Sequence, residues 1–310
     1  MLRHRTRLTV ALGAAGAVLA AVLLLVALTG PSDRPPGNGA LTTAPGSYLG
    51  VYLTGIPGSY APITRFSAAT QVRPNVAVYY SAWFEPFRSG FARAAAEHHA
   101  VTLVQINPAG ISLRAIASGR YDAYLDSYAV AVRSYRHPVI IGFGHEMNGW
   151  WSSWGYRHTT PAVFTAAWRH VVTVFRTDRV KNVTWLWTVN VIDFRGAIRD
   201  PSPWWPGDRY VTWVGLDGYY RTSALRFAAL FGPTIRVVRT LTRDPILISE
   251  TGAAPAAGQP AKIADLFGGV RAYGLLGAVW FDAVGHQDWR IRGAASINAF
   301  RRAASSYPLR

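Results

Sequence analysis

Near its middle the chain reads Val139-Ile140-Ile141-Gly142-Phe143-Gly144-His145-Glu146-Met147-Asn148-Gly149. A short apolar run bounded by glycine is typical of a buried β-strand, and a glutamate follows this one closely. The pattern recurs where Ile246-Leu247-Ile248-Ser249 leads into Glu250-Thr251-Gly252. The chain has only four glutamates, at positions 85, 97, 146 and 250. Two scarce carboxylates that each follow a buried strand suggest an acid/base and a nucleophile for cleaving a glycosidic bond.

Around these two segments, short β-branched or aromatic runs alternate with longer amphipathic stretches. The runs predict eight strands, at residues 48–52, 76–80, 101–106, 139–143, 183–189, 211–216, 246–249 and 276–281. The stretches predict helices at residues 86–98, 121–135, 161–176, 224–242, 263–273 and 295–305. The intervals 56–73 and 192–208 look irregular, and the second resembles a surface loop. Eight strands that alternate with helices favour an α/β fold, a (β/α)8 TIM barrel, over an open doubly wound sheet.

The N-terminus differs from the rest of the chain, because basic residues precede an uncharged run over residues 8–28. About 20 apolar residues span a bilayer, whereas a signal peptide uses a core of ~7–15. We interpret residues 1–30 as a membrane anchor with its basic end in the cytoplasm, or alternatively as a cleaved signal peptide. Residues 31–46, rich in Pro, Gly, Ser and Thr, would form a linker. Residues 47–310 would then form a single catalytic domain at the cell surface or outside the cell.

The composition narrows the classes of function. The net charge is +16, and all basic residues except Lys181 and Lys262 are arginine. The arginines are scattered and belong to no recognisable nucleic-acid-binding module, so we expect no nucleic-acid partner. Attraction to an anionic envelope surface is the expected consequence of this charge. The chain has no cysteine, which excludes disulfides, thiolate nucleophiles and cysteine-ligated metals.

In a (β/α)8 barrel the catalytic groups lie at the C-terminal ends of the strands. Glu146 would follow the fourth strand and Glu250 the seventh, which face each other across the mouth. Retaining glycosidases place two carboxyls roughly 5–5.5 Å apart and need no metal or organic cofactor, so we expect none. The alternative is that each glutamate pairs with an arginine. A zinc-protease helix is excluded, because Gly149 occupies the position of its second histidine.

The segment His145-Glu146-Met147-Asn148-Gly149, followed by tryptophans, resembles the acid/base motif of glycoside hydrolase family 26. That family contains mostly endo-β-1,4-mannanases, with some β-1,3-1,4-glucanases and β-1,3-xylanases. Ile248-Ser249-Glu250-Thr251-Gly252 is similar to its nucleophile segment, and Val214-Gly215-Leu216-Asp217-Gly218-Tyr219 to the end of its sixth strand. The resemblance runs in order from about residue 48 to residue 281.

The resemblance implies that Glu146 is the acid/base and Glu250 the nucleophile. It also implies that His145 contacts the sugar in the catalytic subsite and that Tyr219 donates a hydrogen bond to Glu250. Asp217 is expected to support the site through hydrogen bonds rather than to act as a third catalytic acid.

Aromatic rings and amides supply the remaining substrate-binding candidates, since ring faces stack on pyranoses. By the resemblance, Trp151 would line the aglycone side and Trp280 would form the sugar platform. Trp154, among glycines, and Asn148, within the motif, are further candidates. Asn190 ends the fifth strand and contacts either the substrate or a turn. Core packing is the alternative for each tryptophan.

These features predict a retaining β-glycanase that resembles endo-β-1,4-mannanases, acts on a β-linked polysaccharide and is a monomer. The segment Gly142-Phe143-Gly144 replaces an arginine-proline-leucine type of sequence common in the family's mannanases. An endo-β-1,3-1,4-glucanase therefore stays open. An envelope-polysaccharide transglycosylase would use the same two carboxyls, whereas a non-catalytic carbohydrate-binding barrel would use only the tryptophans.

Overall fold

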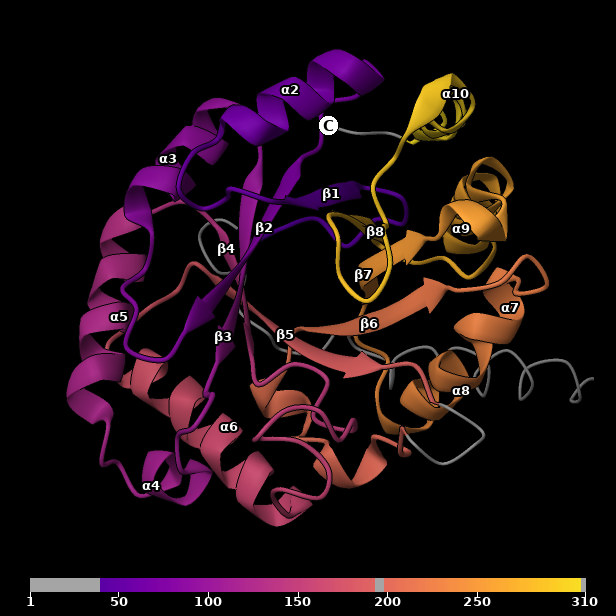
Figure 1. The fold of residues 1–310 in the computed structure, drawn as a ribbon. Coiled ribbons are helices and arrows are strands. Elements are labelled where there is room, and N and C mark those ends of the chain that lie inside the picture. Colours follow the sequence, from indigo (N-terminus) through magenta and orange to yellow (C-terminus); the bar gives the residue numbers. More distant parts are fainter. Residues whose placement is uncertain (1–39, 193–197, 308–310) are drawn as a thin grey trace, which may run out of the picture. The chain divides into compact units, whose positions relative to one another are not determined.

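The computed structural model describes residues 40–192 and 198–307. In this part of the chain eight parallel strands follow one another around a closed barrel (Figure 1). The strands are β1 (Tyr48–Leu53), β2 (Val76–Ala82), β3 (Val101–Asn107), β4 (Val139–Phe143), β5 (Val183–Asn190), β6 (Trp213–Tyr220), β7 (Ile246–Ala253) and β8 (Gly277–Asp282). Parallel pairing of β1 with β8, which sets Val51 beside Trp280, closes the ring. The predicted (β/α)8 barrel is confirmed.

Helices cover the outside of this barrel (Figure 1). They are α2 (Ala61–Thr70), α3 (Ser89–Glu97), α4 (Leu113–Ala117), α5 (Asp122–Tyr135), α6 (Pro161–Thr177), α7 (Phe227–Leu230), α8 (Gly232–Leu241), α9 (Gln259–Ala272) and α10 (Gly293–Ala304). Between β5 and β6 the described residues form two 3-10 helices, η1 (Ser202–Trp204) and η2 (Asp208–Tyr210), and a third, η3 (Pro255–Ala257), precedes α9.

The structure corrects two expectations about helices. The interval 56–73 contains α2, with Pro62 in its first turn and Ile63 and Phe66 buried on one face. The helix predicted over 224–242 is divided into α7 and α8. Pro233 lies in the first turn of α8, and proline has no N–H group with which to continue the preceding helix.

Strands β6 and β7 extend four residues beyond their predicted ends, to Tyr220 and Ala253. Their glycines, which look like turn residues in the sequence, allow close packing inside the barrel. A Cβ on Gly215 would lie 2.5 Å from the hydroxyl oxygens of both Thr188 and Ser249. Glu250 therefore lies on a strand and not in the turn after it.

The barrel interior is filled by side chains from alternate strand positions. The layer nearest the strand N-termini is apolar and includes Val76, Leu103, Ile140, Leu186 and Leu247. A polar layer follows, in which the Gln105 amide Nε2 donates to Thr188 Oγ1 over 2.9 Å. The barrel thus becomes polar toward the C-terminal ends of its strands, where the charged groups lie.

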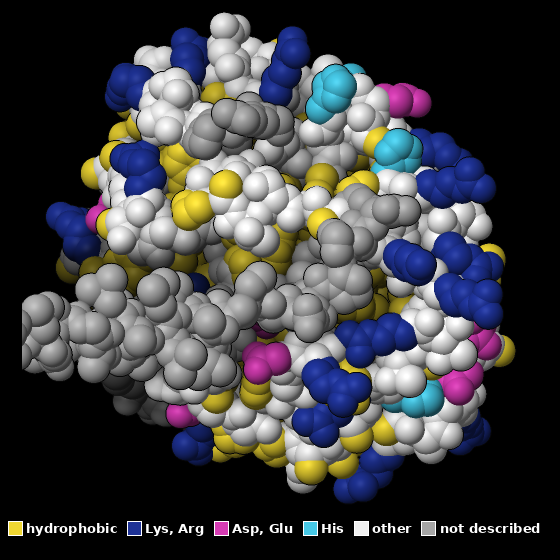
Figure 2. All heavy atoms as spheres, turned by 180° about the vertical axis from the view of Figure 1, so that it is seen from behind, with side chains coloured by type: hydrophobic (Ala, Val, Ile, Leu, Met, Phe, Trp, Pro, Cys, Tyr) yellow, Lys and Arg dark blue, Asp and Glu magenta, His cyan; other side chains and the backbone are white. Residues whose placement is uncertain are grey.

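The predicted anchor at residues 1–30 and most of the linker lie outside the described residues. No helix in residues 40–192 or 198–307 is long and apolar enough to cross a membrane. Figure 2 shows the face behind that of Figure 1, and there the lysine and arginine side chains spread around the edge without forming one patch. This distribution agrees with the scatter of arginines along the sequence.

Candidate active site

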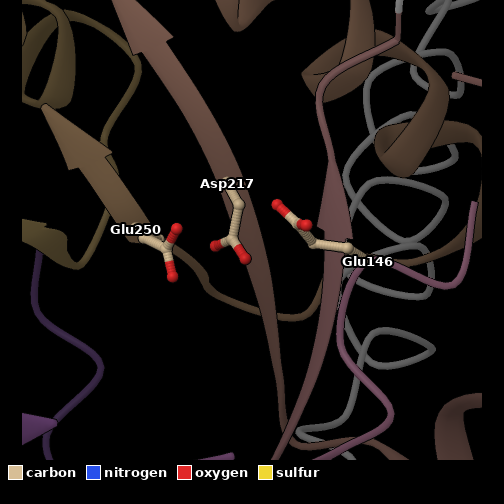
Figure 3. A group of neighbouring side chains, drawn as sticks. All are labelled: Glu146, Asp217 and Glu250. Atoms are coloured by element: carbon tan, nitrogen blue, oxygen red, sulfur yellow. The ribbon is translucent and has the colours of Figure 1, made fainter. Parts of the chain in front are cut away.

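Three carboxyl groups meet at the C-terminal mouth of the barrel, as Figure 3 shows. Glu146 follows β4, Asp217 lies on β6 and Glu250 on β7. One oxygen of each lies within 4.8 Å of an oxygen of the other two. The structure therefore brings the two predicted glutamates together, close to the separation of about 5–5.5 Å found between the carboxyls of retaining glycosidases.

The backbone turns sharply to place Glu146. Both Gly144 and Glu146 adopt a left-handed conformation, with φ of 57° and 56°. The Glu146 amide donates to the Thr188 carbonyl over 3.0 Å, and its carbonyl accepts from the Gly149 amide over 2.9 Å. A left-handed conformation is costly for a residue with a side chain, and these two hydrogen bonds hold the Glu146 backbone in it.

Two donors hold the Glu146 carboxyl. The indole Nε1 of Trp151 donates to Oε2 over 2.8 Å, and the side-chain amide Nδ2 of Asn190 donates to Oε1. Burial and then the nearby charge of Glu250 raise the pKa of Glu146 to about 8, although the two donors partly offset this rise. Glu146 therefore holds a proton at neutral pH.

Two tyrosine hydroxyls hold the Glu250 carboxyl. Tyr219 donates to Oε1 and Tyr80 to Oε2. Burial raises the pKa of Glu250, and both hydroxyl donors act in the opposite direction by stabilising the carboxylate. The two hydroxyl donors thus favour the ionised form of Glu250.

A β-bulge aims Glu250 into the mouth. Leu216 pairs with Ile248, but the next residue of β6, Asp217, pairs with Glu250. Ser249 is therefore an extra residue in β7, and such a bulge re-aims the side chains beside it. Ser249 and Glu250 both contact groups in the barrel interior as a result.

Asp217 lies between the two glutamates (Figure 3) and is only 1% exposed. Its Oδ1 accepts a hydrogen bond from Ser249 Oγ over 2.6 Å. Burial, followed by the charges of Glu250 and Glu146, raises the pKa of Asp217 well above its usual range. Asp217 is thus a buried, hydrogen-bonded neighbour of the glutamate pair whose protonated form is favoured by burial.

Tyr80 is a site residue that sequence reasoning missed. It lies on β2 on the same face as Val76 and Val78, which both point into the barrel interior. This alternation could have placed Tyr80 at the mouth, because the next inward position along the strand lies nearer its C-terminal end. The sequence around Tyr80 has no motif that would have drawn attention to it.

His145 also faces the site, with its ring centroid 5.4 Å from that of Tyr80. Its Nδ1 lies 2.9 Å from Asn107 Oδ1, and its carbonyl accepts from Trp154 Nε1 over 2.8 Å. Burial lowers the pKa of His145 to about 4, so the imidazole is neutral at physiological pH. Trp154 is 6% exposed and supports His145 rather than offering its ring face to solvent.

Asn148 is fully buried, and its side chain forms hydrogen bonds with backbone groups of the protein. Its Nδ2 donates to the backbone carbonyls of Asn190 and Arg199, and its Oδ1 accepts from the backbone N–H of Asn190, all over 2.9 Å. The structure therefore places Asn148 behind the site, where it positions Asn190 and so the donor to Glu146.

The predicted aromatic contacts lie in different surroundings. Trp151 is 43% exposed beside Glu146, whereas Trp280 is 1% exposed and donates to the Trp289 carbonyl over 3.0 Å. The structure does not bring Trp280 to the mouth, because successive residues of a strand face opposite sides. Its neighbour Phe281 instead stacks on Tyr52 of β1, with ring centroids 4.6 Å apart.

Three carboxylates at these separations are close enough to share a hard cation. The glutamate oxygens, however, already accept hydrogen bonds from Trp151, Asn190, Tyr80 and Tyr219. The N–H and O–H donors would have to turn away before a cation could take their place. The donor set therefore fits a pair of hydrogen-bonded carboxyl groups better than it fits a metal centre.

Comparison with known sequences links this site to a family. The model of glycosyl hydrolase family 26 matches residues 98–253, which include both glutamates. Endoglucanase H of Acetivibrio thermocellus is 28% identical over 236 residues, which cover 71% of this chain and 26% of that protein. A mannan endo-1,4-beta-mannosidase of Bifidobacterium adolescentis is 28% identical over 109 residues, or 33% of this chain and 11% of that protein. The chain thus spans about a quarter or less of these relatives.

Solved structures with the same fold include a modular endo-beta-1,4-mannanase from Cellulomonas fimi. It has a TM-score of 0.67 and 19% identity, and the match covers 85% of this chain and 72% of that one. A beta-mannanase from Bacteroides ovatus has a TM-score of 0.60 and 14% identity, over 84% and 86% of the two chains. At these identities the likeness demonstrates a shared barrel.

Proposed function

The chain belongs to glycoside hydrolase family 26, and we propose that it hydrolyses a β-linked polysaccharide with retention of configuration at the anomeric carbon. The observation that carries the proposal is the glutamate pair. Glu146 is held protonated, Glu250 is held by two hydroxyl donors, and their oxygens lie within 4.8 Å of each other. One group can give a proton while the other attacks, which is the arrangement that double displacement needs.

In the first step a Glu250 oxygen attacks the anomeric carbon, and the glycosidic bond breaks. Glu146 gives its proton to the leaving oxygen, so the aglycone departs as a neutral alcohol. Tyr80 and Tyr219 orient the attacking carboxylate through their hydroxyls. The neutral His145 offers its Nε2 to a sugar hydroxyl, since Nδ1 is engaged by Asn107.

The second step needs Glu146 as a base, and formation of the glycosyl-enzyme lowers the pKa of Glu146 so that it can take this role. Esterification removes the negative charge of Glu250, which is one of the causes that raise the pKa of Glu146. The pKa of Glu146 therefore falls, and its carboxylate can accept a proton from water. The water oxygen bonds to the anomeric carbon, the ester bond to Glu250 breaks, and the sugar leaves with its original configuration.

Mannan is the first candidate for the substrate, since relatives by sequence and by structure bear mannanase names. Mixed-linkage β-glucan is the second. The match to endoglucanase H covers 71% of the chain against 33% for the mannosidase, and Gly142-Phe143-Gly144 departs from the segment common in mannanases. We further propose that the protein acts as a monomer at the cell surface or outside the cell, anchored or exported by residues 1–30.

The test is reducing-end release by the full chain in a mild detergent. The substrates are galactomannan, glucomannan, mixed-linkage glucan and β-1,3-xylan. Activity on one of them should disappear in Glu250→Ala and in Glu146→Ala, and NMR of the first product should show the retained anomer. Glu97→Ala, which removes an exposed glutamate at the end of α3, is the matched control and should keep full activity.

Folded protein that is silent on all four substrates would contradict the proposal. Oligosaccharide binding without turnover would then indicate the carbohydrate-binding barrel. Transfer products that form only when an acceptor sugar is added would indicate the transglycosylase.

A further inference from the structure

Phe84 is unusually exposed for a phenylalanine. It lies in the loop after β2 with 58% of its surface open to solvent, more than Trp150 at 49% or Trp151 at 43%. An apolar ring in water forgoes the free energy of burial, and exposed aromatic residues mark many binding surfaces. The proposed reaction gives Phe84 no role.

The backbone of Phe84 is strained as well, with φ at +72°. Glycine or asparagine takes this left-handed conformation at lower cost than a bulky residue. An exposed position with this backbone would thus favour one of those two residues. A large aromatic residue that is both strained and exposed points to a function outside the protein's own core.

The turn that carries Phe84 is rigid. The Glu85 amide donates to the Ala82 carbonyl over 3.2 Å, and the Glu85 carboxylate accepts from the Ala82 amide over 3.1 Å. The hydroxyl of Tyr124 on α5 donates to the Glu85 carbonyl over 3.1 Å. Glu85 thus fixes the turn.

Neighbouring rings hold the Phe84 ring itself. Tyr124 and Tyr121 pack edge to face against it, with centroids 5.5 and 5.7 Å away. Trp83, only 7% exposed, anchors the turn by packing on Tyr124 and Phe143. The Phe84 ring is therefore presented to solvent in a fixed orientation, which lowers the entropy cost of stacking on a ligand.

The position of the turn relates Phe84 to the nucleophile. Strand β2 carries Tyr80, whose hydroxyl holds Glu250, and the chain reaches Phe84 two residues after β2 ends, on the same face of the barrel. Strand β5 and the loop after β4 instead carry Asn190 and Trp151, the donors to Glu146. Phe84 therefore follows the strand that supports the attacking carboxyl, at the C-terminal end of the barrel.

From these observations we propose that Phe84 is a sugar-stacking subsite on the glycone side, at least one ring beyond the sugar that Glu250 attacks. Its ligand is a pyranose ring of the β-linked glycan, whose apolar face lies on the phenyl ring. This inference rests on the proposed function. It adds that the enzyme also binds the polysaccharide at a distance from the cleaved bond and so prefers long chains.

The test separates the ring from the strain. Phe84→Asn removes the ring and suits the left-handed backbone, so the relief of strain offsets the lost ring contacts with Tyr121 and Tyr124, and Tm should stay close to that of the wild type. In full-length Glu250→Ala protein, calorimetric titration with β-1,4-mannohexaose and with a mixed-linkage glucan hexasaccharide measures binding. Phe84→Asn should weaken binding of the preferred hexasaccharide about tenfold and leave that of the matching disaccharide unchanged.

Two control variants accompany this test. Phe84→Trp restores an aromatic face and should recover most of the affinity. Tyr273→Ala removes another exposed ring, after α9 and near the opposite end of the barrel, and should bind like the parent.

Each outcome bears on a different claim. Equal hexasaccharide affinity with and without the Phe84 ring overturns the subsite and leaves the enzyme intact. Loss of a protein dimer in Phe84→Asn, with unchanged glycan affinity, assigns the ring to a protein contact instead. Wild-type protein that cleaves no glycan, together with Glu250→Ala protein that binds neither hexasaccharide, overturns the proposed function as well.

Discussion

Glu146 and Glu250 have the same side chain, and their immediate neighbours make them different acids. Glu146 accepts one amide and one indole donor and has a pKa raised to about 8, whereas Glu250 accepts two hydroxyl donors. The proposed reaction requires Glu250 ionised and Glu146 protonated. We expect a bell-shaped dependence of kcat/KM on pH, with an alkaline limb near pH 8 set by Glu146 and an acidic limb set by Glu250.

Removing a hydroxyl donor should move the acidic limb. In Tyr80→Phe and Tyr219→Phe the Glu250 carboxylate loses a hydrogen bond that lowers its pKa, so the pKa rises and the acidic limb shifts to higher pH. We also expect kcat to fall about a hundredfold, as for loss of one preorganised donor. Tyr273→Phe, remote from the site, is the control for both measurements. An acidic limb that stays in place would show that these hydroxyls do not tune Glu250.

Removing the amide donor should move the other limb. Asn190→Ala deletes a hydrogen bond that favours ionised Glu146, so its pKa rises and the alkaline limb shifts upward. Asn182→Ala is the matched control, because Asn182 lies immediately before the same strand and donates to the Val132 and His137 carbonyls. That variant should lower Tm without moving either limb. Opposite results for the two asparagines would contradict the assignment of the donor.

At the scale of elements, single positions decide how strands and helices pack. The extra residue in β7 turns Glu250 toward Tyr219, so a strand irregularity and not a loop completes the site. Pro233 divides one predicted helix into α7 and α8, and Phe227 of α7 then packs against α9 at Gly269.

The neighbouring glycines of α9 provide a test of this packing. A Cβ on Gly268 would meet no atom within 4 Å, whereas a Cβ on Gly269 would lie 2.0 Å from Phe227 Cγ. Gly268→Ala should raise stability by about 0.5–1 kcal/mol, because alanine restricts the unfolded chain and favours helix. Gly269→Ala should lower it by about 1–3 kcal/mol through overpacking. Thermal melts of the two variants check this, and equal shifts would contradict the contact between α7 and α9.

On the scale of the whole molecule, the buried carboxyl groups of the site lower the free energy of unfolding as pH rises. The pKa values of Glu146, Asp217 and Glu250 are all raised by burial, so the folded state binds these protons more tightly than the unfolded state. Stability must then fall as pH rises from the unfolded pKa toward the folded pKa, which for Glu146 means from about 4.5 to about 8.

We therefore expect a higher Tm at pH 5 than at pH 8, and a smaller difference between the two in Glu146→Gln. The contribution of Glu146 is about 2–4 kcal/mol, or roughly 5–10 °C in Tm. Calorimetric melts at both pH values measure it, with Glu97→Gln as the control on an exposed glutamate. An unchanged pH dependence in Glu146→Gln would show that Glu146 does not carry this proton.

The amino-acid sequence alone determined the barrel and its two glutamates. Strand periodicity and the order of the elements are local signals, and the motif around Glu146 stands out because glutamate is so scarce in this chain. The tertiary structure alone decided which side chains reach those glutamates. Tyr80 joins Glu250 across the mouth from a strand 170 residues away in sequence, and a bulge aims Glu250 at it. Trp280 points into the core because side chains alternate along β8, and the Asn148 side chain is hydrogen-bonded to Asn190 behind the site. Such contacts depend on strand register and barrel closure, which are properties of the assembled ring that no local pattern of residues records.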